Sequence, residues 1–194
     1  MSYFYSKSNQ KKLWEIADSS IERSFSHHIY QLPIEWQNES FLFENRGTFV
    51  TLTIGSHLRG CIGSILPKRM LWKDVSENAI HAAFHDPRFT PLTREEFSVL
   101  DLEVSVLTVP EQISPESRQD LYHMIKPGVD GVVLQHGSAK ATFLPQVWEE
   151  LPNPEDFFRH LCIKAGVSKN IFLTQFSEFT FLTYQVEIIK KSNP

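Results

Sequence analysis

The residues best suited to chemistry in this chain are a thiol and a guanidinium in one short segment, Leu58-Arg59-Gly60-Cys61-Ile62-Gly63. A cysteine becomes a nucleophile when a nearby cation or helix N-terminus lowers the pKa of its thiol, and Arg59 is such a cation. Gly60 and Gly63 let another segment or a ligand approach the backbone closely. The segment is therefore either a site for an anion or an electrophile, or a tight corner in which Cys61 is a small buried hydrophobe.

Four other residues extend this candidate site. Asp86 and Arg88 lie in a turn, Asp86-Pro87-Arg88-Phe89, that ends a predicted helix. Two interpretations stay open: the two charges pair within the turn, or Arg88 points into a cleft and binds a carboxylate or phosphate bidentately through its guanidinium. Gln146 follows a predicted strand, and Lys164 lies in the last turn of a helix, where lysine often only stabilises the helix dipole.

Other signals for chemistry are weaker. His81 and His85 are four positions apart on one predicted helix, which is a metal-ligand spacing, but Ala82 stands where zinc proteases carry glutamate. We therefore predict no metal site. Cys162 lies inside an amphipathic helix and is expected in the core. No Ser-His-Asp set at recognisable spacing, G-x-S-x-G turn or phosphate-binding glycine loop is present.

The elements that must position these residues follow from hydrophobic periodicity. We predict helices over residues 10–25, 71–84, 93–97, 117–125 and 154–165. We predict strands over residues 49–54, 57–65, 102–107, 131–135, 140–144 and 181–189. Hairpins and alternating strands favour antiparallel pairing. The expected fold is α+β, with a curved, mostly antiparallel sheet built from both halves of the chain and helices on its outer side.

The order of these elements predicts an internal duplication. The pairs Gly55-Ser56 and Gly137-Ser138 lie 82 positions apart, and an ungapped shift of that size places helix on helix and closing strand on closing strand. We expect one domain over residues 1–194. It contains pseudo-symmetric strand-hairpin-helix-strand halves at 48–109 and 130–190, joined by a linker at 110–129.

This alignment assigns the chemistry to the first half. Arg59 and Cys61 align with Ala141 and Phe143, so the second half lacks both functional groups. The apolar counterpart Phe143 predicts that Cys61 faces inward. Gln146 and Lys164 are the residues by which the second half would complete the site.

Composition bounds the classes of function. The chain has 194 residues, 41% of them hydrophobic, and a net charge of −4. A negative net charge does not favour binding to nucleic acid or to an anionic membrane, although it does not exclude a local basic patch. We expect no membrane span, and with two cysteines and no secretory signal we expect reduced thiols and a cytoplasmic location.

Seven segments together resemble one known family. They are Phe49-Val50-Thr51-Leu52, Leu58-Arg59-Gly60-Cys61-Ile62-Gly63, Asn78-Ala79, Asp86-Pro87-Arg88-Phe89, Val104-Ser105-Val106-Leu107-Thr108, Leu144-Pro145-Gln146-Val147 and Lys164-Ala165-Gly166. In this order they are similar to the AMMECR-one domain family, known in bacteria and archaea as the AmmeMemoRadiSam system protein A, from about Leu13 to Ile189.

The resemblance implies an α+β fold with two similar halves, and it implies a Memo-like protein and a radical SAM protein as partners. It implies no reaction, since the family's activity is not established, and it identifies no cofactor. Five residues carry over from the family's motifs: Arg59, Cys61, Asp86, Arg88 and Lys164.

Three functional hypotheses follow. The leading one is binding of a small anionic ligand or a partner at the Leu58–Gly63 turn, by Arg59, Gly60, Gly63, Asp86, Arg88, Gln146 and Lys164. The second is a non-enzymatic adaptor or RNA-binding module, and a third is a scaffold whose motif is wholly structural. A thiol-dependent enzyme with Cys61 as its catalytic residue is the sharper version of the first, so whether the protein is an enzyme stays open.

Overall fold

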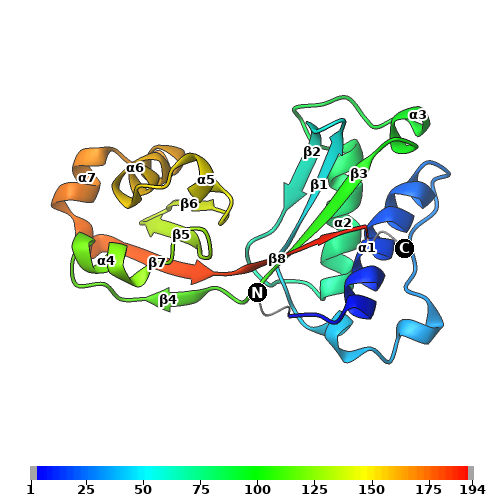
Figure 1. Cartoon of the computed structure of the whole chain (residues 1–194), viewed down its shortest axis with the longest axis horizontal. Coiled ribbons are helices and arrows are strands. Elements are labelled where there is room, and N and C mark those ends of the chain that lie inside the picture. The colour runs from blue at the N-terminus through cyan, green and yellow to red at the C-terminus, as the bar shows by residue number, and fades with distance from the viewer. Residues whose placement is uncertain (1–3, 192–194) are drawn as a thin grey trace. The chain divides into compact units, whose positions relative to one another are not determined.

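A computed structural model describes residues 4–191 and divides them into two compact units. The first unit holds the described residues up to Val109 and again from Glu187, and the second is Pro110–Val186. Each unit has a four-stranded antiparallel sheet with helices (Figure 1). The expected α+β class is therefore confirmed, whereas the expected single curved sheet is wrong because the strands form two sheets.

The first unit has the sheet order β2-β1-β3-β8. Its elements are α1 (Lys7–Ser24), short 3-10 turns at Ile34–Trp36 and Ser40–Phe43, β1 (Thr48–Ile54), β2 (His57–Gly63), α2 (Leu71–Phe84), α3 (Arg94–Phe97), β3 (Asp101–Leu107) and β8 (Val186–Lys190). Along β1, Val50 and Leu52 are fully buried in the core with α1 and α2, while Thr51 and Thr53 on the opposite face are partly exposed. This period of two is that of a strand covered on one face only.

Buried carboxylates join distant segments within this unit. Asp74 of α2 accepts hydrogen bonds from the Thr48 amide (2.9 Å) and the Ser64 hydroxyl (2.8 Å), which ties the helix to β1 and to the residue that follows β2. Glu187 of β8 accepts from the Gln10 side chain at 2.7 Å and so ties the last strand to α1. Each charge is buried only where several donors surround it, as the cost of desolvation requires.

The second unit has the sheet order β4-β7-β5-β6. Its elements are β4 (Glu111–Ile113), α4 (Arg118–Met124), β5 (Gly131–His136), β6 (Ala139–Phe143), α5 (Val147–Glu150), α6 (Pro154–Lys164), α7 (Lys169–Thr174), a 3-10 turn at Phe176–Glu178 and β7 (Phe179–Tyr184). Its core is aromatic: the Trp148 and Phe157 rings stack with centroids 3.6 Å apart. This stacked pair joins α5 to α6.

Local signals predicted most elements well. The helix at 71–84 has those bounds, and the helix expected from residue 10 begins at Lys7, because Ser6 caps it by accepting from the Asn9 amide. The strand expected at 181–189 is two strands, β7 and β8, which belong to different sheets. β4, α5 and α7 were not predicted. Among the described residues, no helix is long and apolar enough to cross a membrane.

The two sheets share a connectivity, because β3 lies beside β1 as β7 lies beside β5. The ungapped alignment nevertheless fails at the closing strand. Val50 pairs with Val104, whereas Val132, its aligned residue, pairs with Thr183 and not with Val186. The shared order agrees with a duplication, which itself stays a prediction.

A β-bulge in β2, the strand that contains Arg59 and Cys61, also changes how this strand aligns with the second half. The β1–β2 register shifts between Leu52 and Thr53, which leaves Arg59 as an extra residue without a partner on β1. Beyond the bulge, Cys61 lies opposite Thr51.

The residue in the second sheet that matches Cys61 is therefore Thr142, which lies opposite Val133, the aligned position of Thr51. The predicted counterpart Phe143 is wrong by one position. Since a shift of one residue along a strand reverses the face, the inward orientation inferred for Cys61 is wrong too.

Candidate functional site

The backbone of Cys61 lies on the outer edge of the first sheet, where β2 has a neighbour on one side only. The Cys61 amide donates to Asp86 Oδ2 at 2.9 Å, and the Cys61 carbonyl accepts from Arg88 Nη2 at 3.1 Å. An acceptor and a donor from one ion pair thus take the place of a neighbouring strand. This closes an edge that would otherwise be open to pairing with another chain.

Asp86 is the buried half of that ion pair. Its side chain is 2% exposed, and it accepts from Arg88 Nε (3.0 Å), from Arg88 Nη2 (2.7 Å) and from the Arg88 amide (3.1 Å). The side-chain hydrogen bonds from Arg88, helped by the amides of Cys61 and Arg88, hold the pKa of Asp86 well below its usual range. Pairing within the turn, one of the two interpretations of this motif, is confirmed.

The glycines of the motif make room for this arrangement. A Cβ added to Gly60 would lie 2.2 Å from the carbonyl oxygen of Ala82 in α2, and one added to Gly63 would lie 2.2 Å from the Phe49 ring. Neither glycine has a positive φ, so close packing rather than backbone conformation requires them. Their contacts are with the protein itself, which favours the structural interpretation of both.

Arg59 is committed to a different partner. Its Nε and Nη2 donate to the two carboxylate oxygens of Glu96 at 2.9 and 2.8 Å, and Nη2 also donates to the Thr90 carbonyl at 2.9 Å. The Arg59 side chain is 12% exposed. These hydrogen bonds lower the pKa of Glu96, which also accepts from the Thr93 amide in the capping box of α3. Arg59 therefore anchors α3 to β2, and its charge is balanced by Glu96.

The Cys61 side chain lies on the same face as Thr51 and is partly exposed. Its Sγ is 3.4 Å from Thr51 Oγ1, a contact typical of directly opposed residues in a non-hydrogen-bonded pair. The guanidinium carbons of Arg88 and Arg59 lie 5.5 and 5.8 Å from the ring centroid of Phe89. The thiol, a hydroxyl and one exposed guanidinium are thus the chemical groups that the motif assembles.

Gln146 and Lys164 belong to the second unit, so the predicted set is divided between the units. Lys164 Nζ donates to the Thr142 carbonyl at 3.0 Å and lies 5.0 Å from the Phe143 ring centroid. Lysine therefore caps this edge carbonyl as Arg88 caps that of Cys61, but within residues 4–191 no side chain accepts from the Thr142 amide as Asp86 does. Gln146 precedes α5, and its Oε1 is buried without a hydrogen-bond partner in the described chain.

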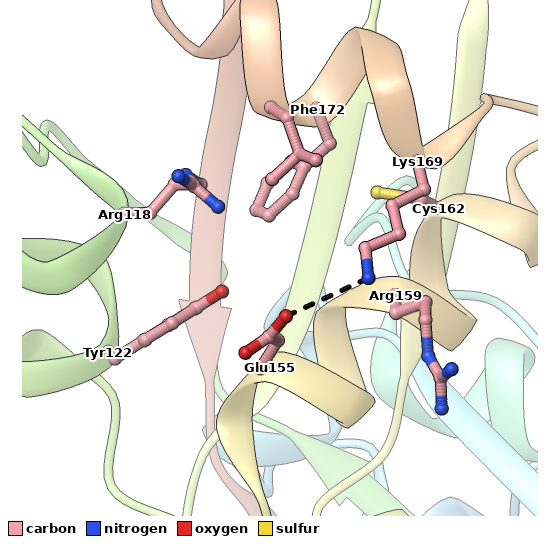
Figure 2. A pocket seen from close by; sticks show the side chains of 8 residues that line it. Arg118, Tyr122, Glu155, Arg159, Cys162, Lys169 and Phe172 are labelled. Atoms are coloured by element: carbon pink, nitrogen blue, oxygen red, sulfur yellow. Dashed lines mark ion pairs between the residues drawn. The ribbon is translucent and has the colours of Figure 1, made fainter.

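The second cysteine is a core residue, as predicted. Cys162 is fully buried, and burial raises the pKa of its thiol to about 11. It lines a cavity of about 10 Å³ beside Phe172, near the ion pair between Lys169 and Glu155 (3.8 Å) (Figure 2). That volume is about what one water molecule requires, so the cavity has no room for a substrate.

The histidine pair gives no metal-binding geometry. The His81 and His85 rings are 5.5 Å apart and both are exposed. Across the described residues, no three or more His, Cys, Asp or Glu side chains are grouped to hold a metal ion.

Sequence reasoning missed two members of this site, Glu96 and Thr51. Glu96 had a detectable signal, the Thr93-x-x-Glu96 capping box, but a capping box says nothing about an arginine 37 positions earlier. Thr51 had none, because its position beside Cys61 depends on the bulge in β2.

Comparisons with known proteins agree on one family. The family model described as AMMECR1 matches residues 14–189. A protein of Methanothermobacter thermautotrophicus is 44% identical over 130 residues, which cover 66% of this chain and 68% of the relative. A protein of Nanoarchaeum equitans is 34% identical over 163 residues, 83% of this chain and 89% of the relative.

A solved structure has the same fold. The crystal structure of an uncharacterized protein from Pyrococcus horikoshii superposes with a TM-score of 0.85 at 31% sequence identity. The match covers 97% of this chain and 94% of the other.

The exposure of the two thiols leads to a chemical prediction. In the native protein, iodoacetamide is expected to alkylate Cys61 and leave Cys162 unmodified, because Cys162 is fully buried and its pKa is raised. Peptide mass spectrometry of alkylated samples checks this, and Cys162 should react once the chain is unfolded in urea. A Cys61 that resists the reagent until unfolding would show that its thiol is inaccessible and would end any nucleophilic role.

The second prediction concerns Asp86. Asp86→Asn should destabilise the protein by about 2 kcal/mol at pH 7, since charge-assisted hydrogen bonds contribute roughly 1.5–3 kcal/mol. The pKa of Asp86 is lowered in the folded state, so its contribution is present above the unfolded pKa of about 3.9 and is lost as pH falls below it. The difference between wild type and variant in urea unfolding should therefore shrink below about pH 4.

Asp156→Asn is the matched control for that measurement. Asp156 forms an exposed pair with Arg159 at 2.7 Å, and exposed pairs contribute about 0–1 kcal/mol. If the Asp86 and Asp156 variants lose equal stability, with the same dependence on pH, the closure of the strand edge by Asp86 has no energetic importance.

Proposed function

This chain belongs to the AMMECR1 family, and from that premise we propose that its first unit binds a small ligand carrying an acidic group, with Arg88 as the recognition residue and the Cys61 thiol beside it. The observation that carries the proposal is the contrast within one ion pair. The Arg88 side chain is 53% exposed, while that of Asp86 is 2% exposed. The pair is neutral overall but presents its positive end to solvent.

The hydrogen bonds of Arg88 leave one amino group of the guanidinium, Nη1, available. Nε and Nη2 are held by Asp86 and by the Cys61 carbonyl, and Nη1 makes no hydrogen bond within residues 4–191. A planar guanidinium suits carboxylate and phosphate groups, which accept from its N–H donors with defined geometry. A carboxylate or phosphate that accepts from Nη1 is therefore the ligand chemistry that Arg88 would recognise.

The same hydrogen bonds make the guanidinium rigid. An exposed arginine usually loses side-chain entropy when it binds, but here Asp86 has already fixed the orientation of Arg88. A preorganised donor loses less entropy on binding and so gives more affinity per contact. This supports Arg88 over the other predicted residues, because Arg59 is occupied by Glu96, and Gly60 and Gly63 serve packing.

Thiol chemistry at Cys61 is the second candidate, favoured by the contact of its partly exposed sulfur with Thr51 Oγ1 at 3.4 Å. The arginine expected to activate it, Arg59, is paired with Glu96. Arg88, which donates to the Cys61 carbonyl at 3.1 Å and is 53% exposed, is the other cation beside Cys61, with Asp86 as its ion-pair partner.

The family resemblance is the sole basis for proposing protein partners. We propose that the protein acts with a Memo-like protein and a radical SAM protein. Co-elution of the three purified proteins in size-exclusion chromatography would support this. Separate elution of the three proteins would count against it.

The ligand proposal has a direct test with inorganic phosphate as the probe. Phosphate should shift the backbone amide resonance of Cys61 in a saturable manner, because Arg88 donates to the Cys61 carbonyl. Arg88→Gln should weaken this binding by roughly tenfold, the loss of one charge-assisted interaction. Arg88→Lys, which keeps the charge but not the planar fork, should fall between the two.

Arg94→Gln is the control, since Arg94 is an exposed arginine of the same unit that stacks on Phe25. Urea unfolding verifies that each variant is folded. Equal affinity in wild type and Arg88→Gln, or no saturable shift in the wild type, would show that Arg88 is a structural residue only.

A further inference from the structure

A second candidate site adjoins the first, because Thr51, which contacts the Cys61 thiol, also lines it. It is a groove of about 580 Å³ in the first unit, within the range of about 300–1,000 Å³ typical of small-molecule sites. Its lining residues come from α1, from β1, from the end of α3 and the beginning of β3, and from the end of β8. The lining residues that matter here are Trp14, Asp18, Asp101, Glu103, Lys190 and Lys191.

The groove contains a carboxylate without a close partner. Asp18 is partly buried and makes no hydrogen bond, and no ion pair within 4 Å, in the described chain. Burial and the neighbouring charge of Glu22 raise its pKa, whereas Lys191 lowers it. With Asp101 and Glu103, the groove holds three carboxylates against two ammonium groups.

The chain's own lysines show which chemistry the groove accepts. The Lys191 ammonium lies 5.1 Å from the ring centroid of Trp14, and Lys190 Nζ lies 3.3 Å from Glu103 Oε2. The Trp14 ring is held in place, because its Nε1 donates to the Leu102 carbonyl at 3.0 Å. An ammonium over a fixed indole face, beside a carboxylate, is a favourable arrangement for a cation.

We infer that this groove binds a primary alkylammonium group, in the position that the Lys191 ammonium occupies in this structure. The ligand ammonium would lie between the Trp14 ring and the Asp18 carboxylate, and a second amine would reach Glu103. Displacing Lys191 has a small cost, since it lies on an exposed side chain whose ammonium regains full hydration. The ligand class differs from the acidic ligand proposed for Arg88, and no charged residue of the groove contacts Arg88 in the described chain.

Three small probes test the ligand class by NMR of the Trp14 indole N–H, which is assigned by its loss in Trp14→Phe. They are 1,5-diaminopentane, N-acetyl-lysine methylamide and the neutral 1,5-pentanediol. The diamine should shift the resonance saturably and the diol should not, because only the amine forms the cation–π and ionic contacts. Binding of the lysine derivative as well would identify a lysine side chain as a source of the group, and its failure would restrict the source to small diamines.

Two variants test the position of the ligand. Lys191→Ala should tighten diamine binding by roughly two- to fivefold, because it removes the competing ammonium. Asp18→Asn, which preserves shape, should weaken binding by roughly two- to tenfold. Lys73→Ala is the matched control: its ammonium lies 5.4 Å from the Trp72 ring in the same unit but outside the groove, so affinity should not change.

Two results would overturn the inference. One is equal binding of the diol and the diamine, which would show that charge is not recognised. The other is an affinity that neither Lys191→Ala nor Asp18→Asn changes, which would show that the ammonium binds elsewhere or not at all. Urea unfolding verifies that Trp14→Phe, which keeps an aromatic ring but loses the hydrogen bond to the Leu102 carbonyl, is folded.

Discussion

The buried carboxylate of Asp86 is the interaction on which the motif region depends. A charge that is almost fully desolvated is tolerated only when donors surround it. Here the donors are the Arg88 guanidinium and the amides of Arg88 and Cys61, so the turn after α2 is joined to the edge of β2. The strand must then lie against the end of α2, and only glycine fits at position 60, opposite the Ala82 carbonyl. The need to surround the buried Asp86 carboxylate with donors thus accounts for Arg88 and for Gly60.

The sheets of the two units have the same strand connectivity but differ in the charged side chains that bind their edge strands. In the first sheet an acceptor and a donor close the edge at Cys61. In the second, the side chain that caps the carbonyl of the matching residue, Thr142, is Lys164, and no other does so in the described part of the chain. An ion pair with one buried member fixes its surroundings more strongly than a single exposed lysine does, because separating it leaves a buried charge. The edge that holds the thiol is therefore the more rigidly built of the two.

Much of the fold was predictable because its signals are local. The helical period of α2 and the Gly-Ser turns of both hairpins are read within a few residues. The strand at 181–189 was misjudged because the chain passes from β7 to β8 at Gln185 without any turn residue. Hydrophobic alternation shows that a segment is a strand but does not tell which sheet it joins. One extra residue at Arg59 likewise moved the counterpart of Cys61 from Phe143 to Thr142, and only the observed pairing reveals such a bulge.

The sequence by itself determined the α+β class, the family, most of the helices and strands, and the group of residues around Cys61. The tertiary structure alone decided which oppositely charged side chain each residue of this group pairs with. Arg59 pairs with Glu96, 37 residues away, whereas Asp86 pairs with Arg88, only two residues away. The physical reason is that periodicity and capping act over one or two turns of chain. Ion pairs and hydrogen bonds between elements depend on distances of a few ångströms, which strand register and helix packing set.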